Sequence, residues 1–291
     1  MGTRGPTGAA RLGEEALMMH HTESHSAWQR FWERGGWWRA LLLVAVYYGL
    51  YQGLAVLVVS PLAAANRDNP DANIWLSYAL PIALGGVILV VFGLSVRWLR
   101  ELFGPQPVHG RWWMWIGVAI PLIFAVLHFA AIDYGAAGTN LVLGWLVSGL
   151  FIGFAEEVLA RGFVVQLLRR AGYREIAVAT ISAALFSALH AGNLLGGQDL
   201  LTTLIQLVYT FAFGILMYLT LRVTGNLIWP ILLHAATDPS TALLAEFPGG
   251  GGLAAFAGLG NFFVIGAGLI LLFCIRGHSE WKPRAGEPHP E

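Results

Sequence analysis

Two neighbouring glutamates and an arginine lie inside a stretch of sequence that is otherwise apolar. Glu156, Glu157 and Arg161 follow an apolar run that begins near residue 141, and a second apolar run follows them. An ionised side chain at the centre of a bilayer is costly, so such residues usually face the protein interior and mark a functional site. Carboxylates can also take and return protons during hydrolysis. The three charges therefore indicate a buried active site.

The spacing of these residues gives the two carboxylates different roles. On a helix, Glu157 and Arg161 are four residues apart and lie on one face, with the acid N-terminal to the base, which is the favourable order. This pair can neutralise itself. At 3.6 residues per turn, Glu156 points about 100° away and has no such partner. We expect one carboxylate to be held in an ion pair and the other to be free for proton transfer.

Two further residue pairs, each containing a histidine, occur in later apolar runs with a spacing of four residues. Phe186 and His190 form one pair, and His234 and Asp238 form the other. Pro239 follows Asp238 directly and disfavours helical geometry at the residue before it. We therefore expect the helix to loosen at Asp238.

These polar residues point to function only as a set. A single membrane histidine can be a helix–helix hydrogen-bond partner, and a Glu–Arg pair can be purely structural. Two carboxylates and two histidines from three apolar runs, with few other charges nearby, are better explained by convergence in one cavity, which is typical of an active site. Such groups can supply the base, the acid and the oxyanion stabilisation that peptide hydrolysis needs. The same side chains could also bind Zn²⁺.

The composition predicts which elements position these residues. Of the 291 residues, 56% are hydrophobic and 12% are charged, whereas a soluble domain averages about 25% charged residues. A membrane-spanning helix needs about 20 apolar residues. Eight runs approach this length, at 40–59, 74–96, 113–132, 141–168, 176–195, 200–221, 227–244 and 253–275. The sequence thus predicts an all-α fold, a polytopic membrane bundle of about eight transmembrane helices.

The placement of basic residues predicts the topology. Most of the 17 Lys and Arg flank alternate ends of the apolar runs, so the positive-inside rule puts both termini in the cytoplasm. We expect disordered cytoplasmic tails at 1–36 and 277–291, with a membrane bundle over 37–276. The single cysteine allows no disulfide within the chain and no Cys-based metal site. We expect no nucleic-acid partner.

The three motifs resemble the CPBP family of intramembrane proteases, which includes the type II CAAX prenyl endopeptidases and the bacteriocin-immunity proteins. The family pattern is Glu-Glu-x-x-x-Arg, then Phe-x-x-x-His, then His-x-x-x-Asn/Asp, on separate membrane helices. The motifs quoted above match it in this order, over a protease core of about residues 141–240.

The resemblance implies peptide hydrolysis within the membrane. It implies that Glu156 and His190 activate a water molecule and that Glu157 and Arg161 brace the site. His234 and Asp238 would stabilise the oxyanion or bind a metal.

The identity of residue 238 bears on the role of a metal. Family members with Asn at this position offer an amide donor, whereas Asp238 could donate only when protonated, which burial favours. An ionised Asp238 would suit a metal better. The metal would be Zn²⁺ or another divalent ion, held by Glu156, His190, His234 and Asp238. Water activation without a metal fits the same residues, and the sequence does not choose between the two.

We therefore expect an intramembrane (metallo)endopeptidase whose peptide or protein substrate arrives from the lipid bilayer. Two other classes stay open. Membrane Glu and His also form proton relays in proton- or ion-coupled transporters, although the chain shows no pair of similar halves of the kind many transporters carry. A non-catalytic membrane scaffold of the same fold is the third class. Cleavage of a peptide by the purified protein would separate the first class from the others, and proton-coupled flux in liposomes would support the second.

Overall fold

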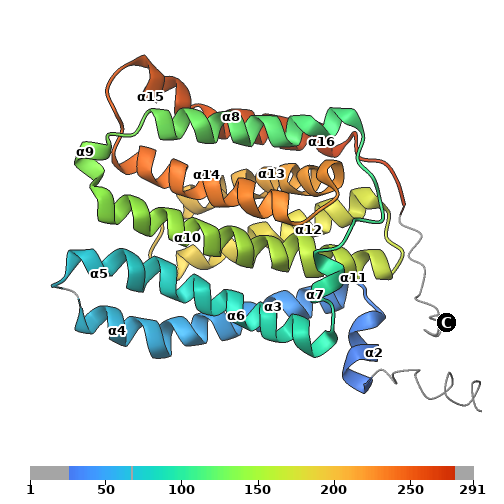
Figure 1. Cartoon of the computed structure of the whole chain (residues 1–291). Coiled ribbons are helices and arrows are strands. Elements are labelled where there is room, and N and C mark those ends of the chain that lie inside the picture. Colours follow the sequence, from blue (N-terminus) through green and yellow to red (C-terminus); the bar gives the residue numbers. More distant parts are fainter. Residues whose placement is uncertain (1–25, 67, 279–291) are drawn as a thin grey trace, which may run out of the picture.

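The computed structural model describes residues 26–66 and 68–278. This part of the chain consists of helices joined by turns and loops, and it contains no β-strand. Two isolated β-bridges join Ile132 to Pro248 and Arg174 to His278. The long helices form rods that run back and forth side by side (Figure 1). The predicted all-α membrane bundle is thus confirmed.

The first half of the described chain builds three rods. Its elements are α2 (Ala27–Glu33), α3 (Trp37–Leu54), η1 (Ala55–Val59), α4 (Ser60–Ala65), α5 (Pro70–Ile74), η2 (Trp75–Ala79), α6 (Leu80–Val96), α7 (Leu99–Leu102), η3 (Trp112–Trp115), α8 (Ile116–Ala130) and α9 (Tyr134–Ala137). The wide π-helical turns η1 and η2 continue the helices on either side of them, so α3–α4 and α5–α6 each form one rod.

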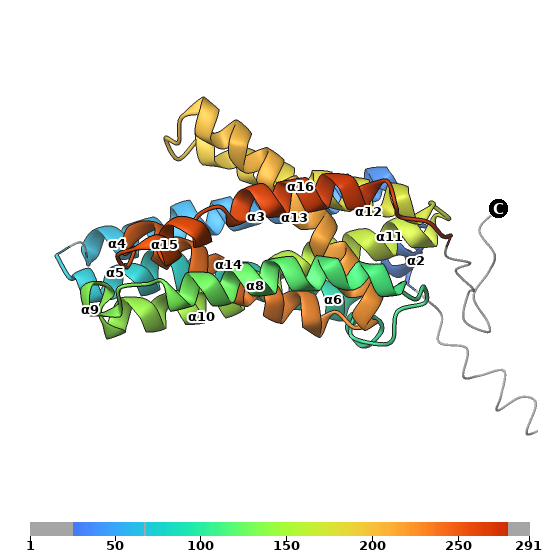
Figure 2. The same ribbon diagram turned by 90° about the horizontal axis from the view of Figure 1, so that it is seen from above.

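The second half builds five more rods. Its elements are α10 (Thr139–Glu157), η4 (Val158–Val164), α11 (Val165–Arg170), α12 (Glu175–Leu189), η5 (His190–Leu194), α13 (Leu200–Thr224), α14 (Ile228–Glu246), α15 (Gly252–Ala257) and α16 (Gly260–Leu272). Helix α10 packs most extensively against α14, and α13 packs against α12 and α16. The hairpin of η5 and the first turns of α13, joined by residues 195–199, leans away from the rest of the bundle (Figure 2).

Seven helical segments of the described residues are long and apolar enough to cross a membrane. They are Trp37–Ala65, Ala72–Val96, Trp112–Ala130, Thr139–Arg170, Glu175–Leu194, Leu200–Thr224 and Gly252–Leu272. Helix α14 is the eighth long rod, and its hydropathy is lower because it carries His234, Asp238 and two prolines. The chain is therefore an integral, multi-pass membrane protein.

Helix α2 differs from the disordered tail predicted for residues 1–36. Ser26 and Gln29 form a reciprocal capping box that starts this helix. The ring of Trp32 then packs edge-on against Phe92 of α6, with 5.1 Å between ring centroids. Local capping and aromatic burial together order a segment whose composition suggested a solvated tail. Residues 1–25 of the predicted N-terminal tail and residues 279–291 of the predicted C-terminal tail lie outside the described residues.

One end of the bundle gathers seven arginines, and we call it the basic end. It contains Arg97, Arg100, Arg111, Arg169, Arg170, Arg174 and Arg222. Helix α2 and the last described residue, His278, lie at this same end (Figure 1), as an even number of crossings requires. The two ends of the described chain therefore lie at the same end of the bundle.

Candidate active site

Two glycines bring α10 and α14 into unusually close contact. A Cβ atom on Gly153 would lie 2.8 Å from the backbone nitrogen of Ala235, and one on Gly149 would lie 2.6 Å from its carbonyl oxygen. Only glycine fits at such distances. Gly149, Gly153 and Glu157 follow each other at four-residue steps, so one face of α10 carries all three. The small-x-x-x-small pattern, which is typical of close helix contacts in membranes, thus places Glu157 against α14.

Glu157 links an arginine on its own helix to a histidine on the neighbouring one. Arg161 Nη1 donates to Glu157 Oε1 at 3.1 Å, which confirms the pair predicted from the spacing. His234 Nδ1 lies 2.7 Å from the same oxygen. All three side chains are almost completely buried. Arg161 lies within η4, a π-helical turn, and such turns inside α-helices occur frequently at functional sites.

Phe186 is the apolar centre around which the charged residues are arranged. The guanidinium carbon of Arg161 lies 4.4 Å from the centre of its ring. The rings of His190 and His234 meet it edge-on, with centroid distances of 5.2 and 5.9 Å. Phe186 is thus a buried core residue and also fixes the positions of three site residues. A phenylalanine one helical turn before a histidine suits both tasks.

His190 begins η5, at the point where α12 ends. Its Nδ1 lies 3.2 Å from the carbonyl oxygen of Phe186. A carbonyl can only accept, so Nδ1 carries the proton and donates. Nε2 is then the ring atom left to accept a proton, because the hydrogen bond of one ring nitrogen sets the state of the other.

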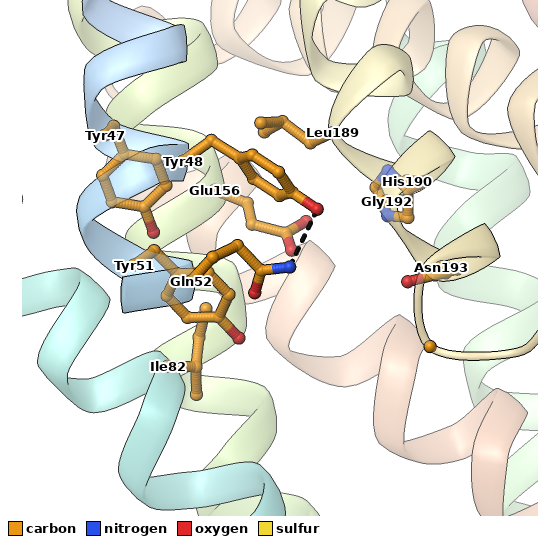
Figure 3. A pocket seen from close by; sticks show the side chains of 11 residues that line it. Tyr47, Tyr48, Tyr51, Gln52, Ile82, Glu156, Leu189, His190, Gly192 and Asn193 are labelled. Atoms are coloured by element: carbon orange, nitrogen blue, oxygen red, sulfur yellow. Dashed lines mark hydrogen bonds between the residues drawn. The ribbon is translucent and has the colours of Figure 1, made fainter. Parts of the chain in front are cut away.

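Glu156 and His190 line the same cavity, although they come from different helices. The cavity has a volume of about 280 Å³ and lies between α3, α6, α10 and η5 (Figure 3). The Oε2 atom of Glu156 is buried and has no hydrogen-bond partner among the described residues. Glu157 therefore forms two hydrogen bonds, whereas Glu156 Oε2 forms none and has only a longer contact, with His234.

His234 faces the same carboxylate from the other side. Its Nε2 lies 3.7 Å from Glu156 Oε2 and 3.4 Å from Asp238 Oδ1. The side chain of Asp238 is 37% exposed, far more than that of His234. Glu156, His234 and Asp238 thus lie close together, and Glu156 shares the cavity with His190, but His234 and Asp238 do not line that cavity. The convergence of all four side chains in one cavity stays a prediction.

The predicted loosening of the helix at Asp238 is wrong. Helix α14 continues through Pro239 to Glu246. Pro239 cannot donate to the carbonyl of Ala235, which removes one intrahelical hydrogen bond. The close contact with Gly149 at the same point packs α10 against this turn, so the backbone has no room to open.

The donor set for a metal is incomplete in this arrangement. Among the described residues, no group of three or more His, Cys, Asp and Glu side chains has the arrangement of a metal site. Nδ1 of His234 is already bound to Glu157, which leaves one ring nitrogen of this residue. Metal binding by Glu156, His190, His234 and Asp238 stays a prediction.

The second wall of the cavity was not anticipated from the sequence. It consists of Tyr47, Tyr48, Tyr51 and Gln52 on α3, with Ile82 of α6 and Asn193 of η5 beside them. A signal was present, because Tyr-Tyr-x-x-Tyr-Gln puts polar atoms on neighbouring turns of an apolar helix. Residues of this kind in a membrane span usually face the protein interior.

Comparison with known proteins adds to this geometry. Residues 138–239 match a family model described as Type II CAAX prenyl endopeptidase Rce1-like. No curated protein and no solved structure matches the chain. The matched segment runs from the start of α10 into α14 and holds all six predicted site residues. This match confirms the resemblance to CPBP proteases over residues 138–239, the segment that is similar to the Rce1-like type II CAAX prenyl endopeptidases.

Proposed function

We propose that this protein is an intramembrane endopeptidase that hydrolyses a peptide bond with a water molecule activated by Glu156 and His190. One observation carries the proposal. The two side chains come from separate helices, line one cavity in the bundle, and each keeps an atom that can accept a proton. The match of residues 138–239 to a protease family supports it.

In the proposed reaction, a water in the cavity gives a proton to the unpaired oxygen of Glu156. The resulting hydroxide attacks the carbonyl carbon of the scissile bond. Glu156 then returns the proton to the leaving amine, so the same carboxyl group serves as base and acid. His190 holds the water through Nε2, because its Nδ1 is fixed on the carbonyl of Phe186.

The developing oxyanion needs a donor, and His234 is suited to this role. Glu157 holds its Nδ1, which directs Nε2 toward Glu156 and Asp238. Because Nδ1 donates to the Glu157 carboxylate, Nε2 carries a proton only when the ring is an imidazolium. In that form Nε2 can donate to an oxyanion that forms there, and such preorganised donors contribute strongly to catalysis. Arg161 offsets the charge of Glu157 and acts through position rather than by contact with substrate.

A divalent metal such as Zn²⁺ would supply an alternative way to activate the same water, with Glu156, His190, His234 and Asp238 as its ligands. The contact of His234 Nδ1 with Glu157 fits both versions, because a ligating histidine commonly hydrogen-bonds a carboxylate through its other ring nitrogen. Metal analysis of the purified protein, together with cleavage before and after chelation, distinguishes the two. Loss of cleavage on chelation and recovery with Zn²⁺ would overturn the metal-free version.

The substrate is a peptide or protein segment that reaches the cavity from the bilayer. The cavity lies between helices that cross the membrane, so a membrane-embedded segment can approach it laterally. We also propose that the basic end faces the cytoplasm, because basic residues are enriched on that side of membrane proteins. This orientation puts both termini in the cytoplasm. Labelling of single cysteines introduced at residue 100 or 133 of intact cells tests it.

A peptide screen with purified protein in detergent tests the activity. The screen includes prenylated and unprenylated peptides, since the cavity does not identify the natural substrate. Glu156→Gln, purified in the same way, is the control for contaminating proteases. We expect cleavage by the wild type and almost none by the variant. Equal cleavage by both proteins would contradict the proposal, and binding without cleavage would favour the scaffold.

A further inference from the structure

The cavity has two walls of different origin. Glu156 and His190 belong to the protease-family segment, whereas Tyr48 and Gln52 project from α3, which lies outside residues 138–239. Figure 3 shows the α3 side chains facing His190 and Asn193 across the cavity. The α3 wall therefore lies outside the segment that matches the family.

Several hydrogen-bonding groups of these walls are left without a partner among the described residues. Gln52 Nε2 donates to the Tyr48 hydroxyl oxygen at 3.0 Å, so the hydroxyl proton and the Gln52 carbonyl oxygen remain free. Asn193 Nδ2 donates to Gln206 Oε1 at 2.9 Å, which leaves its own carbonyl oxygen free. The second amide N–H of Gln52 and that of Asn193 are free as well. The cavity thus offers both donors and two carbonyl acceptors from two opposite sides.

The Gln206 contact also shows that Asn193 is held in place. Gln206 Oε1 accepts a second hydrogen bond, from Gln198 Nε2, at 2.9 Å. These three side chains tie η5 to the following turn and to α13. On the facing wall, a Cβ on Gly192 would collide with the Tyr48 hydroxyl, so α3 and η5 touch there and fix the width of the cavity.

The charge of the cavity limits what can bind. None of the residues that line it is Lys or Arg, and Glu156 is its one acidic side chain. An anionic ligand would be repelled, and a large apolar ligand would leave these polar groups unpaired. A neutral ligand that presents both N–H and C=O groups fits. An extended peptide main chain presents these groups alternately, whereas a helix already satisfies them internally.

We propose that Tyr48, Gln52 and Asn193 bind the unwound main chain of the substrate beside the scissile bond. This inference rests on the proposed protease function and specifies how its substrate is held. Unwinding a membrane helix exposes main-chain groups that water and lipid cannot satisfy in the bilayer. The two carbonyl oxygens accept from substrate N–H groups, and the Tyr48 hydroxyl donates to a substrate carbonyl. They are positioning residues, since none of them takes part in proton transfer.

A binding experiment tests the inference without relying on cleavage. The probe is a fluorescent 20-residue transmembrane peptide of Leu and Ala with a central Gly-Gly pair, which unwinds easily. A control peptide of the same length carries Leu-Leu in place of the Gly-Gly pair. Affinity is measured by anisotropy for Glu156→Gln protein in nanodiscs. We expect the Gly-Gly peptide to bind more tightly than the Leu-Leu peptide.

The wall variants then show whether this preference depends on the proposed contacts. Three substitutions keep the approximate size of the side chain and remove its hydrogen-bonding group: Tyr48→Phe, Gln52→Met and Asn193→Leu. Each variant should weaken Gly-Gly binding by about 3- to 10-fold, the range of a single net hydrogen bond, and leave Leu-Leu binding unchanged. Tyr78→Phe is the matched control, since Tyr78 is exposed and lies outside the cavity.

An ester-containing peptide distinguishes direct contact from a general loss of structure. Replacing one central amide of the Gly-Gly peptide by an ester removes a single N–H. If Gln52 accepts from that N–H, the ester weakens binding to the parent protein but not to Gln52→Met. Equal penalties in both proteins at every central position, or wall variants that behave like Tyr78→Phe, would overturn the inference. Absence of cleavage by the wild type would instead refute the protease proposal alone.

Discussion

Two clusters of buried charge lie in this bundle, and they differ in how completely their hydrogen bonds are formed. One is centred on Glu157, with Arg161 and His234, and the other on Glu175, with Arg169 and Arg222. Both glutamates are fully buried. By burial and charge alone, either cluster is a candidate for a functional site.

The Glu175 cluster is almost saturated. Arg169 donates to both carboxylate oxygens, at 2.9 and 2.8 Å, and Arg222 donates at 3.1 Å. The hydroxyl of Tyr218 donates to the carboxylate as well. The backbone nitrogen of Glu175 donates to the carbonyl of Gly277. These contacts join the start of α12 to the ends of α11 and α13 and to the last described residues, which is a structural task.

The Glu157 cluster is left partly unsatisfied. Arg161 and His234 share one carboxylate oxygen of Glu157, and the other oxygen has no partner among the described residues. Oε2 of Glu156 and two nitrogens of Arg161 are in the same condition. Buried polar atoms without partners are rare in stable structures. Next to a cavity, they indicate a place where water or substrate completes the network.

The largest effect on stability is expected from the saturated cluster. Glu175→Ala leaves Arg169 and Arg222 buried without their counter-charge, so the free energy of unfolding should fall by about 3–5 kcal/mol. Thermal unfolding in detergent measures this. Cleavage per folded molecule should stay near that of the wild type. A variant that is as stable as the wild type but inactive would mean that this cluster, too, has a catalytic task.

A somewhat smaller loss of stability is expected from Arg161→Ala. Glu157 loses its arginine but keeps His234, so the cost should lie near the lower end of that range, at about 3 kcal/mol. This variant should also lose activity, because His234 would turn toward the uncompensated carboxylate. Thermal unfolding and cleavage per folded molecule distinguish Arg161→Ala, which should lose both stability and activity, from Glu175→Ala, which should lose only stability. Retention of both stability and activity would show that Arg161 does not balance Glu157.

The opposite behaviour is expected for Glu156, the carboxylate whose Oε2 forms no hydrogen bond and lies 3.7 Å from His234 Nε2. Glu156→Gln keeps the volume and removes the base, so turnover should fall by at least about 100-fold, or about 2.7 kcal/mol in the barrier. Thermal stability should change little, since the variant keeps the side-chain volume and loses only the 3.7 Å ion-pair contact with His234. Near-native turnover by the folded variant would place the base elsewhere.

The contrast between the clusters also shows what a sequence can reveal. The pair of Glu157 with Arg161 and the isolation of Glu156 follow from helical periodicity, and both were predicted. The eight apolar runs likewise became rods; the run predicted at 227–244, for example, is α14, Ile228–Glu246. Periodicity and hydropathy act within one segment, so they give the helix and the face on which each residue lies.

Contacts between segments could not be predicted in the same way. His234 lies 77 residues from Glu157 in the chain, and their contact depends on how closely Gly149 and Gly153 let α14 approach. The α3 wall of the cavity and the Glu175 cluster depend on equally distant pairings. A helical pattern states which face is polar but not which neighbour meets it. For the same reason, the sequence suggested a cavity but not its second wall.

The smallest effect is the additional loss of turnover expected when Glu156 and His190, which act as one catalytic unit, are both substituted. His190→Ala alone should reduce turnover about as much as Glu156→Gln, by at least about 100-fold, because Nε2 no longer holds the water for the base. Once the base is removed, a correctly held water has no group to which it can give its proton. The double variant should therefore lose little beyond either single variant, because residues that act as a unit are strongly non-additive. Single-turnover cleavage by the four proteins measures the coupling. If the two losses multiply, His190 and Glu156 act on different steps, and the shared cavity would not be a single catalytic unit.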